Sequence, residues 1–405
     1  MARIGFALLL AAAAAGPLAA ASPNPKDLAV TAEQASRAQG LVRKLASDAF
    51  WEREEAQEEL AKMGRLAKPV LAEASVADPD PEVRCRCRLL LPKAAAEDLR
   101  VRVETFLADT QGRFDHDLPG WNQFRKAVPN TPAARELFAE MLADEANRAI
   151  LTAVGGPPGE LGQLVAHRKA EFSPARGGGP RGGAWGGRGG GREPTSTDLA
   201  ALLFAESQVP SRFVPILTRG PNAAVPASTY AITTLAQSGG PRGEVYRAVV
   251  AAWAKTRDES YQLNAALNVA ETLKLEETAE VAARLFATPG VPGYRTRAAA
   301  TLVQLGAKDQ LPALEKLLSD DAKLVSFMVV GGEPFELQVR DVALATCLAL
   351  TGQEPKDYGF SEMYGGGRGT LTNWSLTAEA RPAAFERWKA WREKNPEFGK
   401  ESGKR

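Results

Sequence analysis

The amino-acid sequence predicts an all-α fold, and more narrowly an α-solenoid in which pairs of helices stack along the chain. The first observation is a repeat, because shifting the stretch from Ala227 to Leu318 by 33 residues places apolar or small positions on one another. The second is periodicity, since its apolar residues recur three or four positions apart, as on one face of a helix. Neither helix of a pair could bury such a stripe alone, so we expect neighbouring pairs to stack.

The repeat can be followed residue by residue through the first helix of each pair. The 33-residue shift places Ala265 on Ala298, Ala266 on Ala299, Val269 on Leu302 and Ala270 on Val303. A shift of 34 residues adds an earlier copy that begins at Ala231. A last copy, from Val339 to Leu350, follows a longer insertion. We therefore predict a repeat array over residues 196–352.

Residues 22–174 predict a separate N-terminal lobe that is also helical. A helix that opens at Ser47 carries Trp51, Ala56 and Leu60 as its apolar positions. Its opposite face is crowded with charged side chains, which are typical of a solvated surface.

Several motifs between Leu41 and Leu91 carry a family resemblance, namely Glu-Arg-Glu-x-Ala, Leu-x-x-x-Gly and Asp-x-Asp-Pro-Glu-Val-Arg. They resemble HEAT and armadillo-type repeats, and more closely the helical modules of exported bacterial proteins that have no assigned activity. Further pieces from Leu118 to Arg125 and from Leu350 to Phe360 resemble the same group. The resemblance implies stacked helix pairs and implies no particular chemistry.

The composition changes abruptly between Arg176 and Arg192, where seventeen residues include ten glycines and four arginines. Its small apolar surface cannot offset the conformational entropy that the segment would lose on folding. We therefore expect residues 175–195 to form a disordered linker between the two lobes. Arginines with an interleaved aromatic can also bind a polyanion. The candidate residues for such binding are Arg176, Arg181, Trp185, Arg188 and Arg192.

The two ends of the chain lie outside the predicted array. Residues 353–395 predict a glycine-rich loop and then a capping helix with Phe385, Trp388 and Trp391 on one face, and residues 396–405 predict a disordered tail.

At the N-terminus, residues 1–21 have the pattern of a signal peptide: Arg3 precedes an apolar run, and three alanines end at Ala21. Cleavage after Ala21 would place the mature chain in the periplasm or outside the cell. The alternative is an uncleaved N-terminal anchor, although the apolar run is short for a membrane span. We expect no transmembrane segment in the mature chain.

The charges of the chain are balanced, with 50 Lys and Arg residues against 49 Asp and Glu residues. This balance gives no reason for the chain as a whole to bind nucleic acid.

Few residues are candidates for chemistry. Cys85 and Cys87 lie two apart in a helix and point away from each other, which disfavours a bridge, and Cys347 is expected in the core. His116 lies between two aspartates, but adjacent residues rarely converge on one metal ion, so we expect it in a solvent-exposed turn. His167 lies beside the glycine-rich segment. No catalytic or cofactor motif is recognisable, and we expect no metal and no cofactor.

The leading functional hypothesis is therefore a non-enzymatic exported scaffold that presents a helical groove to a protein or peptide partner in the cell envelope. One alternative is an envelope hydrolase with an unrecognised site, for example around His116. The other is polyanion binding through Arg176 to Arg192.

Overall fold

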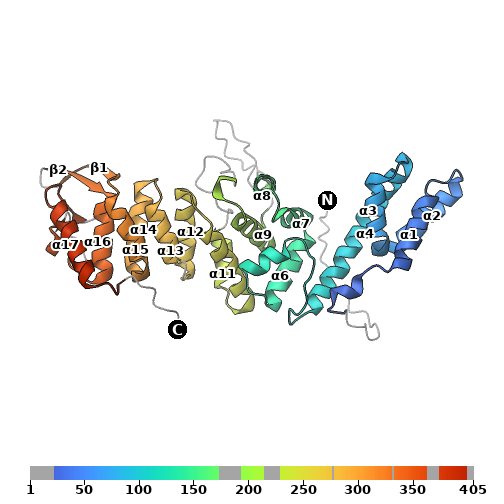
Figure 1. Ribbon diagram of the computed structural model, residues 1–405, viewed down its shortest axis with the longest axis horizontal. Coiled ribbons are helices and arrows are strands. Elements are labelled where there is room, and N and C mark those ends of the chain that lie inside the picture. Colours follow the sequence, from blue (N-terminus) through green and yellow to red (C-terminus); the bar gives the residue numbers. More distant parts are fainter. Residues whose placement is uncertain are drawn as a thin grey trace, which may run out of the picture. The chain divides into compact units, whose positions relative to one another are not determined.

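A computed structural model describes residues 22–172, 193–213, 229–275, 278–330, 333–362 and 374–398. This described part is mostly helical (Figure 1). Contacts between residues divide the chain into two units. Unit 1 comprises Met1–Trp121 and Asn130–Ala139, and unit 2 comprises Asn122–Pro129 and Glu140–Arg405.

Unit 1 consists of helices joined by short connections. Its elements are the 3-10 turn η1 (Pro25–Leu28), α1 (Ala32–Lys44), α2 (Phe50–Met63), η2 (Gly64–Ala67), α3 (Lys68–Ala77) and α4 (Pro81–Ala108). Two further helices, α5 (Trp121–Ala127) and α6 (Pro132–Ala143), contribute residues to both units.

Local chemistry sets the ends of these helices. Gly64 ends α2 at a positive φ of 54°, a conformation that glycine adopts without a steric penalty. Asp80 begins α4, because its side chain accepts a hydrogen bond from the backbone N–H of Glu82 at 2.8 Å and Pro81 fills the first helical position. Helix α3 packs against α4, and α1 against α2, around a core that includes Leu60 and Leu71.

Trp51 departs from the predicted apolar face of α2. Ala56 and Leu60 are buried as expected, but Trp51 is 65% exposed and its neighbour Phe50 is 64% exposed. Both residues lie in the first turn of α2, where their side chains face solvent. The prediction that Trp51 belongs to the buried face is therefore wrong.

Unit 2 contains the longer series of helices. Its elements after α6 are α7 (Glu145–Ala153), α8 (Pro158–Phe172), α9 (Ser196–Ser207), η3 (Ser211–Phe213), α10 (Thr229–Gln237), α11 (Gly240–Lys255), α12 (Ser260–Leu273), α13 (Thr278–Ala287), α14 (Pro292–Gln304), η4 (Lys308–Gln310), α15 (Leu311–Glu315), η5 (Lys316–Ser319), β1 (Lys323–Val330), β2 (Glu333–Gln338), α16 (Val339–Thr351), η6 (Pro355–Tyr358), β3 (Ser361–Glu362), β4 (Trp374–Ser375) and α17 (Arg381–Lys394).

Alternate helices of this series are neighbours. Helices α10, α12, α14 and α16 contact one another in that order, and so do α11, α13 and α15. Consecutive helices from α10 to α14 also pack together. The positions that align under the 33-residue shift point inward, since Ala266, Ala270, Ala298 and Leu302 are all buried. The predicted pairs therefore pack both within a pair and between pairs.

The longer insertion before α16 is a β-hairpin, which an all-α prediction does not include. Strand β1 pairs antiparallel with β2, with Lys323 opposite Gln338 and Val330 opposite Glu333. The short strands β3 and β4 form a second antiparallel pair. The valine-rich composition of β1 favours strand over helix, because β-branched side chains lose rotamer freedom in a helix.

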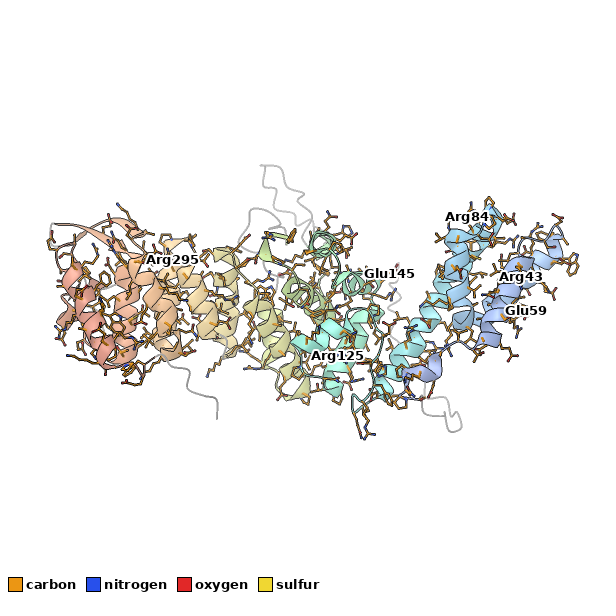
Figure 2. The ribbon with its side chains drawn as sticks, viewed as in Figure 1. Arg43, Glu59, Arg84, Arg125, Glu145 and Arg295 are labelled. Atoms are coloured by element: carbon orange, nitrogen blue, oxygen red, sulfur yellow. The ribbon has the colours of Figure 1, made fainter. Side chains whose placement is uncertain are left out.

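Arginine side chains satisfy the open carbonyl groups at the C-terminal ends of preceding helices. Arg257 donates to the carbonyl oxygen of Glu206, in the last turn of α9, and to that of Val209, just beyond the helix. Arg295 on α14, labelled in Figure 2, donates from Nε to the carbonyl oxygen of Phe286 on α13 at 2.7 Å. A cation placed there also complements the helix dipole, so these contacts join successive helices.

Helices on both sides of the glycine-rich segment belong to unit 2. Helices α7 and α8 precede the glycine-rich segment, yet both pack on α9, which follows it. Most of the predicted linker, the predicted signal peptide and the last residues of the predicted tail (173–192, 1–21 and 399–405) lie outside the described residues.

Candidate functional site

A groove between η5 and α17 is an open concave site in the described part of unit 2. Its volume is about 540 Å³, within the range of ligand and peptide sites. The lining residues of η5 and the end of α15 are Glu315, Lys316, Leu318 and Ser319, and those of α17 are Phe385, Trp388, Lys389 and Arg392. The four α17 residues follow the i, i+3, i+4, i+7 spacing of one helical face, so the whole face lines one wall.

Two ion pairs hold α17 in place beside this groove. Arg381 forms a bidentate pair with Asp341 on α16, at 2.7 and 2.9 Å, and both side chains are largely buried. Arg392 reaches across the groove to Glu315, with Nε 2.5 Å from Oε1. Trp388 is buried and stacks on Trp391, with ring centroids 5.2 Å apart. These contacts join α17 to α16 and to the end of α15, and they place Trp388 on the core side of the wall.

A long connection precedes α17. After α16 the chain forms η6 and the β3–β4 pair before α17 begins, whereas α11 and α13 are direct neighbours. Arg392 and Glu315 form an ion pair across the groove without filling it. Phe385 and Leu318 remain partly exposed at its walls.

The charge of the groove is positive. Its lining includes three cations, Lys316, Lys389 and Arg392, against the single carboxylate of Glu315. Because Arg392 and Glu315 neutralise each other, the two lysines supply the net charge. Both lysines are exposed, and neither forms an ion pair in the part of the chain that the structure describes.

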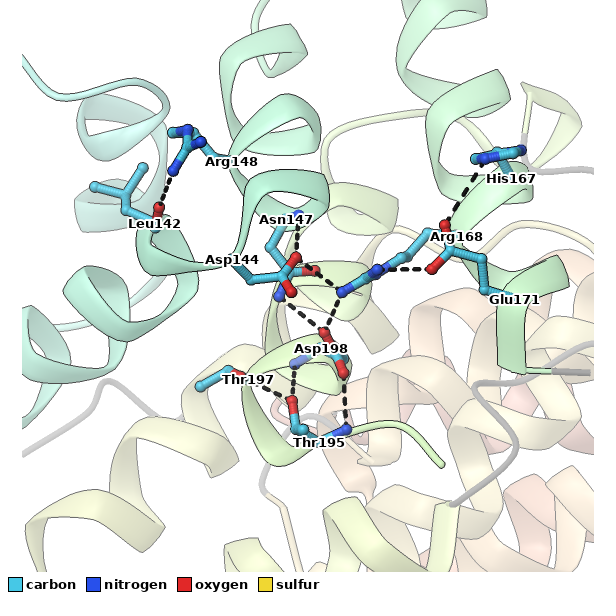
Figure 3. A network of polar contacts seen from close by, with 10 residues as sticks. All are labelled: Leu142, Asp144, Asn147, Arg148, His167, Arg168, Glu171, Thr195, Thr197 and Asp198. Atoms are coloured by element: carbon cyan, nitrogen blue, oxygen red, sulfur yellow. Dashed lines mark hydrogen bonds and ion pairs between the residues drawn. The ribbon is translucent and has the colours of Figure 1, made fainter. Parts of the chain in front are cut away.

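A second cluster, formed by α7, α8 and α9, is centred on the buried side chains of Arg168 and Asp198 (Figure 3). Arg168 donates to Asp198 at 2.6 Å, to Asp144 at 2.8 Å and to Glu171 at 2.7 Å. Burial alone would raise the pKa of Asp198, but hydrogen bonds from Thr195, Asn147 and Arg168 hold that pKa well below its usual range. Asp198 is therefore ionised, and the hydrogen bonds that it accepts from Asn147 and Arg168 join α7, α8 and α9.

His116 is buried, and its predicted placement in a solvent-exposed turn is wrong. Only 4% of its surface is exposed. Asp109 accepts hydrogen bonds from the backbone N–H groups of Arg113 and Phe114, which folds the connector back on α4. This brings Nε2 of His116 to 3.1 Å from Oδ2 of Asp109, and its ring packs edge-on against Phe106.

A small pocket of about 170 Å³ adjoins His116 in unit 1. It is lined by Pro25, Leu28, Ala29, Arg102, Asp115, His116, Asp117 and Leu118, and this lining contains no Ser, Thr or Cys nucleophile. Burial lowers the pKa of His116, and the hydrogen bond with Asp109 opposes that shift only in part. A neutral imidazole oriented by a carboxylate could accept a proton, and the contacts of His116 with Asp109 and Phe106 also anchor the connector.

The structure does not test the predicted polyanion site. Arg176, Arg181, Trp185, Arg188 and Arg192 all lie outside the described residues. His167, at the end of α8, is exposed and 3.7 Å from Glu171.

The three cysteines occupy the predicted environments. All three are free thiols: Cys85 is exposed, whereas Cys87 and Cys347 are buried. Among the described residues, no group of three or more His, Cys, Asp or Glu side chains is arranged to hold a metal ion.

Comparison of the chain with protein-family models, with curated proteins and with solved structures gives no match. Within the described ranges, every helix is too short or too polar to cross a lipid bilayer.

Sequence reasoning identified the α17 side of the groove only as a capping face with Phe385 and Trp388. It missed Lys316 and Lys389, because two lysines 73 positions apart carry no shared sequence signal. Only packing brings them to opposite walls.

Proposed function

We propose that this chain is a non-enzymatic scaffold of HEAT-like helix pairs, which binds a protein or peptide segment in the groove between η5 and α17. The observation that carries the proposal is the exposed apolar surface of that groove, formed by Phe385 and Leu318 above the fixed Trp388. Grooves of this kind suit an amphipathic segment, whose apolar side chains enter while its polar side chains stay in water.

The packing of the helices supports an α-solenoid for this scaffold. First helices contact first helices, and second helices contact second helices, as in a stack of helix pairs. The groove lies between η5, which follows α15, and α17.

Selection from a random peptide library displayed on phage tests this proposal. We expect the immobilised chain to enrich peptides that compete with one another for one site. The Phe385→Glu variant should lose them, because a carboxylate then occupies the apolar wall. The control Leu305→Glu, which alters an exposed leucine outside the groove, should retain them. Failure to enrich any peptide, or enrichment that Phe385→Glu leaves unchanged, would contradict the proposal.

We also propose that the scaffold acts in the cell envelope after export. The support is the sequence of residues 1–21, with its apolar run and its alanines before Ser22. Mass spectrometry of the chain isolated from an envelope fraction should find Ser22 as the first residue. An intact N-terminus, or recovery only from the cytoplasm, would rule out this compartment.

A further inference from the structure

The first turn of α2 exposes two aromatic side chains, of which Phe50 lies under the guanidinium of Arg53, 5.7 Å from its ring centroid. Phe50 and Trp51 are 64% and 65% exposed, although aromatic residues usually contribute to a core or an interface. Trp51 shares one helical face with Glu55 and Glu58, at the spacing i, i+4, i+7. Both glutamates are exposed, and neither forms an ion pair in the described part of the chain.

This face of α2 and the groove of unit 2 have complementary chemistry. The α2 face presents one large aromatic side chain and two carboxylates, while the groove presents apolar walls and two unpaired ammonium groups, those of Lys316 and Lys389. The spacing also agrees. Trp51 and Glu55 are four residues apart, as are Phe385 and Lys389, which corresponds to about 6 Å along each helix axis.

We propose that the groove between η5 and α17 binds helix α2 of a second copy of this chain. Trp51 enters between Phe385 and Leu318, and Glu55 and Glu58 pair with Lys316 and Lys389. This inference rests on the proposed function of the groove and names its partner.

Segments of the chain that flank the array have the wrong charge to occupy the groove. Residues 396–405 contain three cations and two carboxylates, and residues 176–192 contain four arginines and no acid. Positive segments are repelled by the positive lining. The α2 face combines acidic groups with an exposed aromatic ring, which the lining attracts.

The predicted association is open-ended, because the two contacting surfaces differ. A copy that donates α2 to one neighbour still has a free groove for the next, so the contact does not close on itself as a symmetric dimer would. The chains would therefore join head to tail.

Sedimentation of the full mature chain over a range of concentrations tests the proposal. We expect the average mass of the wild type to rise continuously with concentration. Trp51→Ala, and separately the double variant Lys316→Glu with Lys389→Glu, should each weaken association by about 30-fold or more, as for loss of a buried aromatic anchor or of charge complementarity. The controls Leu89→Ala, at another exposed apolar residue, and Lys394→Glu, on α17 outside the groove, should associate like the wild type.

Mixing the two impaired variants provides the decisive result. The Trp51→Ala chain keeps its groove, and the double lysine variant keeps its α2 face, so an equimolar mixture should form a dimer that grows no further. A mixture that stays monomeric, a wild type that stays monomeric up to about 100 µM, or association that Trp51→Ala leaves unchanged would overturn the inference. If the wild type is monomeric while selected peptides still require Phe385, the groove binds another partner and the proposed function stands.

Discussion

Arg168 of α8 donates a hydrogen bond from Nη2 to Oδ1 of Asp198 at 2.6 Å, across the glycine-rich segment that separates α8 from α9 in the sequence. Both side chains are almost entirely buried. A buried charge that loses its partner is strongly destabilising, because the remaining charge stays out of water.

Replacing Asp198 with alanine should therefore lower the free energy of unfolding of unit 2 by about 3 kcal/mol or more. The variant also loses the hydrogen bond that Asp198 accepts from the backbone N–H of Thr195 at the start of α9. Urea unfolding measures the change. As the matched control, Glu140→Ala removes the partly exposed partner of Arg242 and should change stability by less than about 1 kcal/mol. If both substitutions lowered the free energy of unfolding equally, the burial of the Arg168–Asp198 pair would not account for its effect.

Gly162 of α8 marks a close approach between two backbones. A Cβ atom at this position would lie 2.0 Å from the carbonyl oxygen of Phe213 in η3, so one of the two segments would have to move. We expect Gly162→Ala to destabilise the chain by about 1–3 kcal/mol, as for overpacking of a core.

Gly159, on the same helix, provides the control for this substitution. A Cβ atom there meets nothing within 4 Å. Gly159→Ala should leave stability unchanged or raise it by up to about 1 kcal/mol, because alanine loses less backbone entropy in a helix. Thermal unfolding of the two variants distinguishes the cases, and a Gly162→Ala variant as stable as the wild type would mean that α8 and η3 are not in close contact.

The cysteines differ in reactivity for a physical reason. Burial raises the pKa of Cys87 to about 11 and raises the pKa of Cys347 further, so neither forms the reactive thiolate at neutral pH. Cys85 is exposed. In the native protein, iodoacetamide should modify Cys85 at least about tenfold faster than the other two thiols, as peptide mass spectrometry can measure. In urea, all three thiols should react at similar rates. Rapid labelling of Cys87 in the native protein would show that the face of α4 that carries Cys87 is not buried.

Much of the fold could be predicted because local signals determine it. The alanines aligned by the 33-residue shift are buried in α12 and α14, and Gly64 and Asp80 set helix ends through their own conformations and side chains. The hairpin β1–β2 also has a signal in the sequence, because a valine-rich run followed by Gly331-Gly332 favours a strand and a turn.

The candidate site could not be predicted, because it depends on distances between segments remote in sequence. Lys316 and Lys389 line one groove only because η6 and the β3–β4 pair lengthen the connection before α17. Trp51 carries the same apolar signal as a core tryptophan, and only the packing of α2 shows that its first turn projects beyond the core. His116 was misplaced because its burial depends on how Asp109 folds the connector.

The burial of His116 predicts a pH dependence of stability in unit 1. Burial lowers the pKa of His116 below its ordinary value of 6.5, and Asp109, Arg135 and Asp115 are the charged groups around it. As the pH falls below 6.5, the imidazole of the unfolded chain binds a proton that the buried imidazole of the folded chain excludes. The stability contributed by the neutral imidazole is therefore present above pH 6.5 and is lost as the pH falls from there toward the lower pKa of the folded state.

Hydrogen exchange of residues 109–118 measures this effect locally. Between about pH 7 and pH 5, the free energy of opening, corrected for intrinsic exchange, should fall by up to about 1.4 kcal/mol per pH unit. His116→Gln should remove the dependence at some cost in protection, whereas the exposed His167→Gln should leave it unchanged, since the sequence has only these two histidines. A slope that persists in His116→Gln would assign the titration to another group, and protection that rises on acidification would mean that the pair with Asp109 outweighs burial.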